Sequence, residues 1–247
     1  MHLRDLLSRE VAANPPVSLA FLLFARYARA MRHGPPFFHS RRGYHHGSLK
    51  ETLLEAARRL IGERGPSGFT LSDAAKLAGV TPAALYRHFT DRSALIGELR
   101  QRGFELFTQK LEAAWNDGKP EARVAFERMG LAYQSFAREE PGLYTAMFGH
   151  ATGFLPADAT FRPLLLLENA AAAVLRDCGV EKPDGRTLAL QIWSLSHGVA
   201  TLAASGQLSP AYCFSSPEAM VQDAVSALFE AHVRRAFNTP LDGVKRG

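Results

Sequence analysis

Cysteine is scarce in this sequence, and the usual signatures of catalytic and metal sites are missing. The 247 residues include two cysteines, Cys178 and Cys213, which stand far apart and outside any metal-ligand spacing. The sequence therefore indicates neither a disulfide framework nor a zinc site, and it fits a reducing, cytoplasmic compartment. No Ser-His-Asp arrangement, P-loop, dinucleotide fingerprint or metal cluster can be read, so we predict no catalytic residue, no metal and no cofactor. A helical small-molecule enzyme remains as an alternative, which turnover of a candidate ligand would revive.

Apolar runs long enough to cross a membrane are also missing. Residues 17–24 read V-S-L-A-F-L-L-F, far short of the roughly 20 residues that a spanning helix needs. Extended to Met31, this run suits an amphipathic helix with arginines on its polar side; the alternative is a signal peptide, but its cleavage site would fall among those arginines. We therefore expect no membrane association. We expect residues 1–40 to be an N-terminal extension, poorly ordered or with one short helix, unless they result from an upstream start codon.

Acidic residues are few in the first part of the chain, so the net charge of +5 is unevenly distributed. Residues 1–40 carry a net charge of +3 and residues 41–102 a net charge of +5, whereas residues 103–247 carry a net charge of −3. A basic region at one end of a chain is typical of a protein with a polyanionic partner. A non-specific architectural DNA-binding protein, the alternative, would carry its positive charge over the whole chain.

Strand-like alternation is absent, and the pattern that is present predicts two short helices around a tight break at Gly79. This glycine suits the left-handed conformation that ends a helix. Thr81 and Pro82 suit the cap and the first position of the next helix. Leu85 and Phe89 are four residues apart and share the inner face of that helix. The layout is that of a helix-turn-helix, with an ordinary helical hairpin as the alternative.

The flanking residues support the helix-turn-helix. Upstream, Ser48 and Glu51 have the spacing of a capping box that opens a helix. Thr70 can cap the first helix of the pair in the same way, and Asp91 can cap a further helix downstream. The outer face of the second helix combines small side chains with hydroxyl, guanidinium and imidazole groups, which hydrogen-bond phosphates and base edges. These residues are Pro82, Ala83, Tyr86, Arg87 and His88.

This region resembles the DNA-binding domain of TetR/AcrR-type regulators. The match is carried by Tyr44-His45-His46-Gly47, by residues 81–89 and by Arg92-Ser93-Ala94-Leu95. The resemblance implies that the third helix enters the major groove of DNA, that the protein is a dimer, and that a small ligand in a C-terminal pocket controls DNA binding. Most members of this family are repressors, and activation is the alternative.

The resemblance also implies particular DNA contacts. Thr81, Tyr86 and His88 match family positions that contact phosphates, and Arg92 matches a lysine that does so. Arg87 stands where the family commonly has a second aromatic residue, so it either reads a base, as arginine reads guanine, or binds a phosphate. A basic arm before the first helix would follow the DNA backbone or enter the minor groove, and its adjacent histidines favour phosphate contact over a metal site. The predicted DNA-binding residues are Arg41, Arg42, Tyr44, His45, Thr70, Thr81, Pro82, Ala83, Tyr86, Arg87, His88 and Arg92.

The remainder of the chain stays helical and becomes more apolar. We predict helices over residues 121–140, 161–177, 184–205 and 217–237, with a short helix or loop at 143–149. The predicted fold class is all-α, with an N-terminal three-helix helix-turn-helix domain joined to a larger C-terminal helical bundle that binds ligand and dimerises. We place the extension at residues 1–40, the helix-turn-helix domain at 41–95, the ligand-binding and dimerisation domain at 96–240 and a tail at 241–247.

Aromatic residues and methionines recur at helical spacing in the C-terminal region, which is typical either of a bundle core or of an adaptable apolar pocket. The run Trp193-Ser194-Leu195-Ser196-His197-Gly198 resembles the Trp-x-x-x-His-Gly signature of one C-terminal type in the same family. Trp193 and His197 share a face, where packing in the core is favoured over direct contact with a ligand. The predicted ligand-binding residues are Phe126, Met129, Tyr133, Tyr144, Met147, Phe148, Trp193 and His197.

The last two predicted helices form the predicted dimer surface, because their apolar stripes alternate large and small residues. The stripes consist of Leu188, Ile192, Leu195, Val199 and Leu202, then Met220, Ala224, Ala227, Leu228 and Ala231. Together these features predict a ligand-responsive transcriptional regulator, expected to be a repressor. It would bind a palindromic operator in double-stranded DNA as a homodimer, with an affinity that a small apolar effector alters. No motif specifies the effector, the operator sequence or the regulated genes.

Overall fold

The computed structural model describes residues 46–149, 157–208 and 215–238, and side-chain caps begin two of its first three helices. Helix α3 runs over His46–Arg64, α4 over Leu71–Leu77 and α5 over Pro82–Tyr86. At α4 the Thr70 hydroxyl accepts a hydrogen bond from the backbone N–H three residues later (3.1 Å), and Thr81 does the same at α5 (3.3 Å). The predicted caps of these two helices are confirmed.

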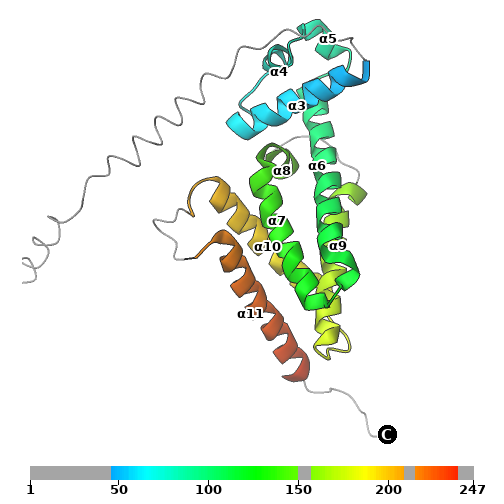
Figure 1. Cartoon of the computed structure of the whole chain (residues 1–247), viewed down its shortest axis with the longest axis vertical. Coiled ribbons are helices and arrows are strands. Elements are labelled where there is room, and N and C mark those ends of the chain that lie inside the picture. Colours follow the sequence, from blue (N-terminus) through cyan, green and yellow to red (C-terminus); the bar gives the residue numbers. More distant parts are fainter. Residues whose placement is uncertain (1–45, 150–156, 209–214, 239–247) are drawn as a thin grey trace, which may run out of the picture. The chain divides into compact units, whose positions relative to one another are not determined.

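A long helix, α6 (Arg92–Trp115), leads from these three helices into the rest of the chain. Asp91 caps it, since its carboxylate accepts a hydrogen bond from the Ala94 N–H at 2.8 Å. A short turn of 3-10 helix, η1 (Asn116–Gly118), ends it. Figure 1 shows α3, α4 and α5 around one end of α6, so this helix connects the helix-turn-helix to the bundle that follows.

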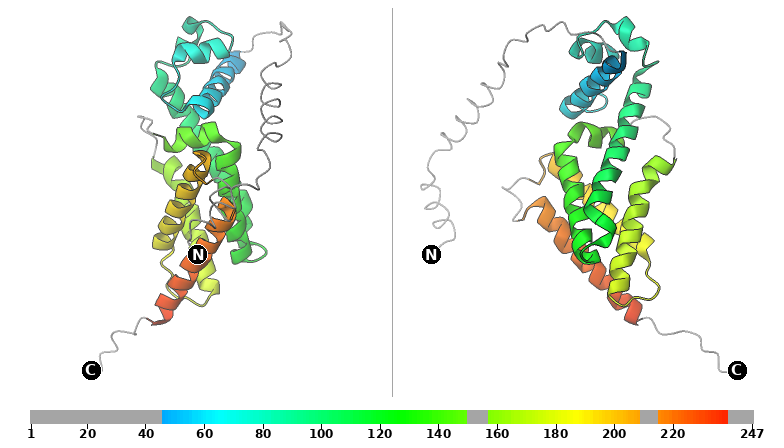
Figure 2. Two further views of the ribbon diagram at one scale, coloured as in Figure 1. Left: turned by 90° about the vertical axis from the view of Figure 1, so that its left-hand side faces the viewer. Right: turned by 45° about the vertical axis from the view of Figure 1, so that its right-hand side comes forward.

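Five further helices complete the described chain: α7 (Ala122–Glu139), α8 (Pro141–Phe148), α9 (Ala157–Asp177), α10 (Gly185–Ala204) and α11 (Pro217–Asn238). α7 and α9 pack along α6, α10 packs against α9 and α11, and α8 lies against both α3 and α6 (Figures 1 and 2). Every regular element within the described ranges is a helix. The all-α fold class with a helix-turn-helix and a C-terminal helical bundle is therefore confirmed. None of these helices is both long and apolar enough to cross a membrane.

The core is one continuous apolar cluster that extends from α3 to α11. One face of α3 is buried in it, with Leu53 and Ala57 fully so. At the contact between α6 and α7 the buried rings of Phe107 and Phe136 lie 5.1 Å apart, centre to centre. Because the cluster and α6 both continue through residues 95 and 96, the predicted domain boundary falls within one helix and one core.

The start of the described chain differs from the predicted one. α3 begins at His46, so Ser48 lies within the helix and the predicted capping box is wrong. The Glu51 carboxylate accepts two hydrogen bonds from the Arg102 guanidinium on α6, one of them 2.8 Å long, and a guanidinium is a stronger partner than a backbone N–H. The predicted extension at 1–40, the arm residues Arg41, Arg42, Tyr44 and His45, and the predicted tail at 241–247 lie outside the described residues.

Candidate nucleic-acid interface and internal cavity

The break between α4 and α5 is a Schellman turn centred on Gly79. This glycine has a φ of 72°, and its N–H donates to the Lys76 carbonyl at 3.2 Å. The next N–H, of Val80, donates to the Ala75 carbonyl at 3.0 Å. A side chain would be strained at this positive φ, so the predicted role of Gly79 in ending the helix is confirmed.

Helix α5 presents one face to the core and the other to solvent. Leu85 is 0% and Phe89 3% exposed, as their spacing predicts. On the opposite side Pro82 and Ala83 are exposed, and Tyr86 is 58% exposed. Two small residues and one protruding tyrosine leave this face open to close approach by another molecule.

Arg87 follows directly after α5. Helix α5 ends at Tyr86, so Arg87 is not part of the helix and occupies its C-cap position. Its φ of −73° and ψ of −22° keep the helical direction, and its side chain is exposed. The Arg87 guanidinium therefore extends from the same exposed end of α5 as Tyr86.

Some charged residues of the helix-turn-helix region form ion pairs within the chain, and others do not. The glutamates of α3 and Glu98 of α6 are engaged in the pairs Lys50–Glu98, Arg58–Glu55, Arg59–Glu63, Arg102–Glu51 and Arg102–Glu98. By contrast, Arg64, Lys76 and Arg87 are exposed and form no ion pair with any described residue. Arg64 and Lys76 lie near the Asp73 carboxylate, whose pKa is lowered first by its hydrogen bonds to Thr70 and then by these two cations. Uncompensated positive charge therefore lies beside α4 and α5, where it suits a phosphate backbone.

The other predicted DNA contacts differ in what their side chains already bind. The Thr70 hydroxyl donates to a carboxylate oxygen of its capping box at 2.7 Å, so a phosphate would compete with that bond. Thr81 accepts at its cap and keeps its own O–H to donate, and His88 is half-buried. The Arg92 guanidinium lies 5.0 Å from the centre of the Phe69 ring, and its Nε and Nη2 have no hydrogen-bond partner among the described residues. Arg92 thus stacks on an aromatic ring at the start of α6.

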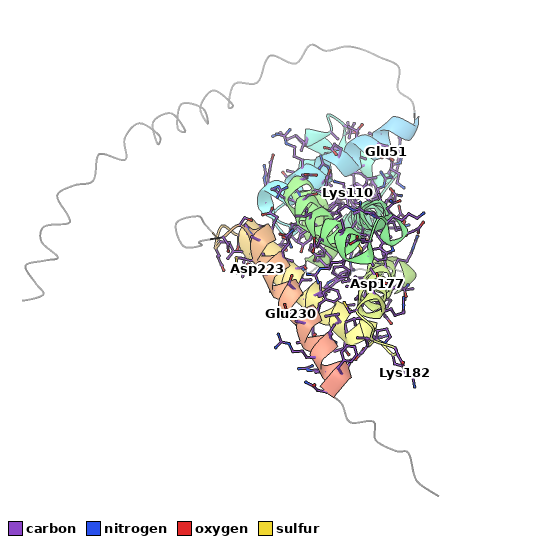
Figure 3. The ribbon with its side chains drawn as sticks, turned by 60° about the horizontal axis from the view of Figure 1, so that its bottom comes forward. Glu51, Lys110, Asp177, Lys182, Asp223 and Glu230 are labelled. Atoms are coloured by element: carbon purple, nitrogen blue, oxygen red, sulfur yellow. The ribbon has the colours of Figure 1, made fainter. Side chains whose placement is uncertain are left out.

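A cavity of about 280 Å³ lies in the C-terminal bundle, between α6, α7, α9, α10 and α11. Most of its lining is apolar, and the charged residues of the lining are exposed or half-buried, so they form its mouth. One of them, Asp223, lies in the first half of α11 (Figure 3). The lining consists of Leu111, Arg123, Phe126, Glu127, Met129, Gly130, Tyr133, Pro163, Leu167, Ile192, Trp193, Ser196, Val221, Gln222, Asp223, Val225 and Ser226.

The predicted ligand-binding residues divide between this cavity and a cluster beside it. Phe126, Met129, Tyr133 and Trp193 line the cavity, whereas Tyr144, Met147, Phe148 and His197 are not part of its lining. The two groups touch through Tyr133, because its hydroxyl lies 3.2 Å from that of Tyr144. The Tyr144 hydroxyl in turn lies 2.8 Å from Nδ1 of His197, whose ring packs 4.7 Å from the ring of Phe148.

Burial keeps the polar groups of this cluster uncharged. Desolvation raises the pKa of Tyr144 to about 12 and raises the pKa of Tyr133 as well. Desolvation also lowers the pKa of His197 from its ordinary value of 6.5. All three groups are therefore neutral at pH 7. Nδ1 of a neutral imidazole can accept from the Tyr144 hydroxyl, which can accept from the Tyr133 hydroxyl.

Helix α8 joins this cluster to the helix-turn-helix region. Its backbone lies directly on α3, since a Cβ added at Gly142 would be 2.1 Å from the Arg58 carbonyl oxygen. The Arg58 guanidinium also pairs with Glu140 at 2.8 Å, just before α8 begins. At the other end of α8, Nε of Arg100 on α6 donates to the Met147 carbonyl at 3.1 Å. Tyr144 belongs to this helix, so contacts continue from the cavity wall to α3.

Sequence reasoning missed several of these residues. Arg64 and Lys76 were not distinguished from the paired cations: Arg59 and Glu63 have a local helix spacing that could be read, but pairs such as Arg102–Glu51 join residues far apart in the chain. Ser196 and Gly130 line the cavity but interrupt the aromatic and methionine pattern on which the predicted pocket was based. Ser196 follows Trp193 by three residues on one helix, and this spacing was a usable signal.

The predicted dimer stripe of α10 is partly wrong. Leu188, Ile192 and Val199 are 0%, 4% and 6% exposed because they pack into the core of the same chain. Leu202 of the predicted stripe is 40% exposed, and so is Leu190 (45%), which the stripe did not include. α10 and α11 do pack side by side, as both views in Figure 2 show.

These features define a helix-turn-helix protein with a C-terminal helical bundle, and comparison with known families gives the same class. The family model "Bacterial regulatory proteins, tetR family" matches residues 53–99. The model "Tetracyclin repressor-like, C-terminal domain" matches residues 126–228. The chain belongs to the TetR family of transcriptional regulators, which are DNA-binding proteins and not enzymes.

Relatives of known sequence or structure are consistent with this assignment. The chain is 34% identical over 109 residues to the nucleoid occlusion factor SlmA of Vibrio vulnificus, a match that covers 42% of this chain and 54% of SlmA. It is 42% identical over 50 residues to the transcriptional regulator AcrR of Shigella flexneri, covering 20% of this chain and 23% of AcrR. The chain thus spans about half the length of SlmA. A structure of a protein of unknown function from Rhodococcus sp. RHA1 matches with a TM-score of 0.66 and 31% identity, covering 78% of this chain and 100% of that one.

Proposed function

We propose that this chain is a ligand-responsive transcriptional repressor that binds a palindromic DNA operator as a homodimer and releases it when a small apolar molecule fills the cavity. The observation that carries this proposal is the continuous contact from the cavity to α3. Tyr133 lines the cavity and lies 3.2 Å, hydroxyl to hydroxyl, from Tyr144 on α8. α8 in turn lies against the backbone of α3 at Gly142.

The DNA-binding part of the proposal rests on α5. Its exposed face and the free cations Arg64, Lys76 and Arg87 suit insertion into a major groove between two phosphate backbones. Arg87 would read a base or a phosphate, and Thr81 and Tyr86 would contact phosphates. The predicted contacts by Arg41, Arg42, Tyr44 and His45 would come from the chain that precedes α3.

The ligand-dependent part rests on a choice between two arrangements of α8. A ligand that contacts Tyr133 would disturb its hydrogen bond to Tyr144 and move α8. Because α8 packs directly against α3, this movement would also displace the helix-turn-helix. In a dimer this changes the spacing of the two α5 helices. A ligand does this only if its affinity for the two arrangements differs.

The dimer part rests on the outer face of α10. Leu190 and Leu202 are exposed there, and a Cβ added at Gly198 would meet nothing within 4 Å. A second copy could therefore approach α10 closely, with α11 beside it. A helix-turn-helix gains specific affinity from two copies because paired half-sites lie one helical turn apart on the duplex.

Selection of bound sequences from random duplexes tests the proposal with the full chain. We expect enrichment of an inverted repeat whose half-sites lie about one or two turns apart. If no duplex is preferred over bulk DNA even at low ionic strength, the alternative of a non-specific DNA-binding protein is correct and the regulator proposal fails.

Repeating the selected-operator binding with apolar ligands tests the response. A ligand that raises the unfolding temperature should weaken operator binding. In the variant Tyr144→Phe the ligand should still bind, but its effect on DNA affinity should shrink because the hydroxyl link to α8 is lost. A ligand that stabilises the protein without any change in operator affinity would contradict the ligand-responsive part alone.

A further inference from the structure

One hydroxyl that lines the cavity has no partner among the described residues. Among the described residues the buried polar side chains are Thr108, Gln134 and Ser196. The Thr108 hydroxyl donates to the Phe104 carbonyl at 2.7 Å, and the Gln134 amide donates to the Ser196 carbonyl at 3.2 Å. The Ser196 residue is 4% exposed and lines the cavity, yet its hydroxyl has no hydrogen bond to any residue that the structure describes. This hydroxyl is therefore free to donate to, or accept from, a polar atom of a molecule in the cavity.

The rest of the inner wall offers a ligand apolar contact. Phe126, Met129, Ile192 and Val225 are buried and line the cavity. The Tyr133 hydroxyl is also a polar group of the wall, but it is within hydrogen-bond distance of Tyr144. A ligand that fits this wall is therefore mostly apolar and has one polar group placed to meet Ser196.

The mouth of the cavity carries no spare positive charge. Its cation, Arg123, pairs with Glu127 at 2.9 Å, donates to the Ser226 hydroxyl at 2.7 Å and lies 5.2 Å from the centre of the Phe229 ring. Asp223, on α11 (Figure 3), adds a second carboxylate to the lining. The formal charge of the mouth is thus negative, which disfavours an anionic ligand.

A glycine on α7, which has no side chain, widens the cavity. Gly130 lines it, and a Cβ added there would meet nothing within 4 Å. The space in front of Gly130 is therefore open to a ligand. A leucine at this position would extend into it.

We propose that the cavity selects an uncharged, mostly apolar molecule of roughly a dozen non-hydrogen atoms. Its single polar group forms a hydrogen bond with the Ser196 hydroxyl, and its apolar part occupies the space in front of Gly130. This deepens the proposed function, because it names the chemical class of the effector for the same cavity.

Three matched probes test the proposal by calorimetry on the full chain without DNA: naphthalene, naphthol and naphthoate. They share one apolar body and differ in having no polar group, a hydroxyl or a carboxylate. We expect naphthol to bind about threefold to tenfold more tightly than naphthalene, the range for one hydrogen bond. We expect naphthoate to bind more weakly than either.

Two variants assign the effect to the named residues. Ser196→Ala should remove the preference for naphthol and leave the affinity for naphthalene unchanged, whereas the control Ser194→Ala, on the exposed side of the same helix, should behave as wild type. Gly130→Leu should abolish binding of all three probes. Circular dichroism and the unfolding midpoint of each variant establish that the fold is retained. If the leucine variant does not fold, Gly130→Ala replaces it, and we expect this variant to bind the probes more weakly than wild type.

Several outcomes would overturn the proposal. Tightest binding by naphthoate contradicts the uncharged class, and equal loss of both neutral probes in Ser196→Ala contradicts the role of its hydroxyl. Failure of wild type to bind any of the three overturns the class as a whole. Operator binding measured in parallel separates the two proposals, because probes that bind through Ser196 without affecting operator affinity would uphold the ligand class and refute ligand-responsive regulation.

Discussion

Under the proposed function, Arg87 is the residue of the α5 surface best suited to read a base. Around it, Pro82 and Ala83 are too small and apolar to discriminate bases strongly, and Tyr86 suits a phosphate. The guanidinium is exposed and forms no ion pair with the described residues, so it is free to form a bidentate contact with a guanine or to bind the backbone.

Arg87→Ala should weaken binding to the preferred operator by about 1–3 kcal/mol and relax the preference at one base position. The reason is loss of a base contact that a phosphate-binding residue would not provide. Competition binding with operator variants measures both effects. Lys76→Ala is the matched control, expected to weaken all duplexes alike, and the same uniform loss in Arg87→Ala would show that Arg87 contacts phosphate only.

His197 makes stability depend on pH through its burial. Its pKa in the folded chain lies below 6.5, so on acidification the unfolded chain binds the proton first. The contribution of the neutral imidazole is complete above the unfolded value and is lost as the pH falls through 6.5 toward the lower folded value. Tyr133 and Tyr144, which face the imidazole, stay protonated over this whole range.

The urea midpoint of the wild type should therefore fall between about pH 7.5 and about pH 5.5, and that of His197→Gln should fall less. Carboxylates with lowered pKa, such as Glu51 and Asp73, lose their contributions only at lower pH. The difference between the two proteins isolates His197. Identical pH profiles would mean that His197 does not contribute in this window.

At the scale of elements, two helix glycines have opposite surroundings. Gly142 in the first turn of α8 is buried, and its backbone N lies 3.4 Å from where a Cβ on Gly62 of α3 would be. This glycine contact lets α8 approach α3. Gly130 on α7 faces open space, so there its lack of a side chain gives no packing benefit within the protein.

Gly142→Ala should lower the free energy of unfolding by about 1–3 kcal/mol, since the added methyl group overlaps the Arg58 carbonyl and separates α8 from α3. Gly130→Ala should raise it by about 0.5–1 kcal/mol, the usual gain from alanine within a helix. Urea unfolding of the two variants compares them directly. A stabilising Gly142→Ala would mean that the α3–α8 contact is looser than its geometry indicates.

For the molecule as a whole, the proposed dimer contact on the outer face of α10 would connect assembly with DNA binding. A monomer would leave Leu190 and Leu202 exposed on one helix, beside α11. Burial of these leucines against a second copy would hold two α5 helices at a fixed separation, so that the second half-site is bound at a high effective concentration.

Leu202→Glu should therefore convert the protein from a dimer to a monomer and weaken operator binding about a hundredfold at equal chain concentration. Light scattering gives the mass, and titration of the selected duplex gives the affinity. Leu131→Glu, at an exposed leucine of α7 (44%), is the control and should remain dimeric. A wild-type mass equal to one chain at micromolar concentration would remove the basis of this prediction.

The helices, the turn at Gly79 and the two faces of α5 could all be predicted from the order of the residues. These depend on caps, a left-handed glycine and a period of 3.6 residues, which act within one or two helical turns and can be read locally. Some ion pairs depend on the tertiary structure, because Arg102 and Glu51 form theirs only in the folded chain. The tertiary structure also decided that Leu188 faces the core and not a partner, and that Ser196 and Gly130 meet in one cavity wall. An apolar helix face predicts that the face will be buried, but it does not predict which surface will cover it. A cavity forms where helices from distant parts of the chain leave space unfilled, so its lining cannot be predicted from any one helix.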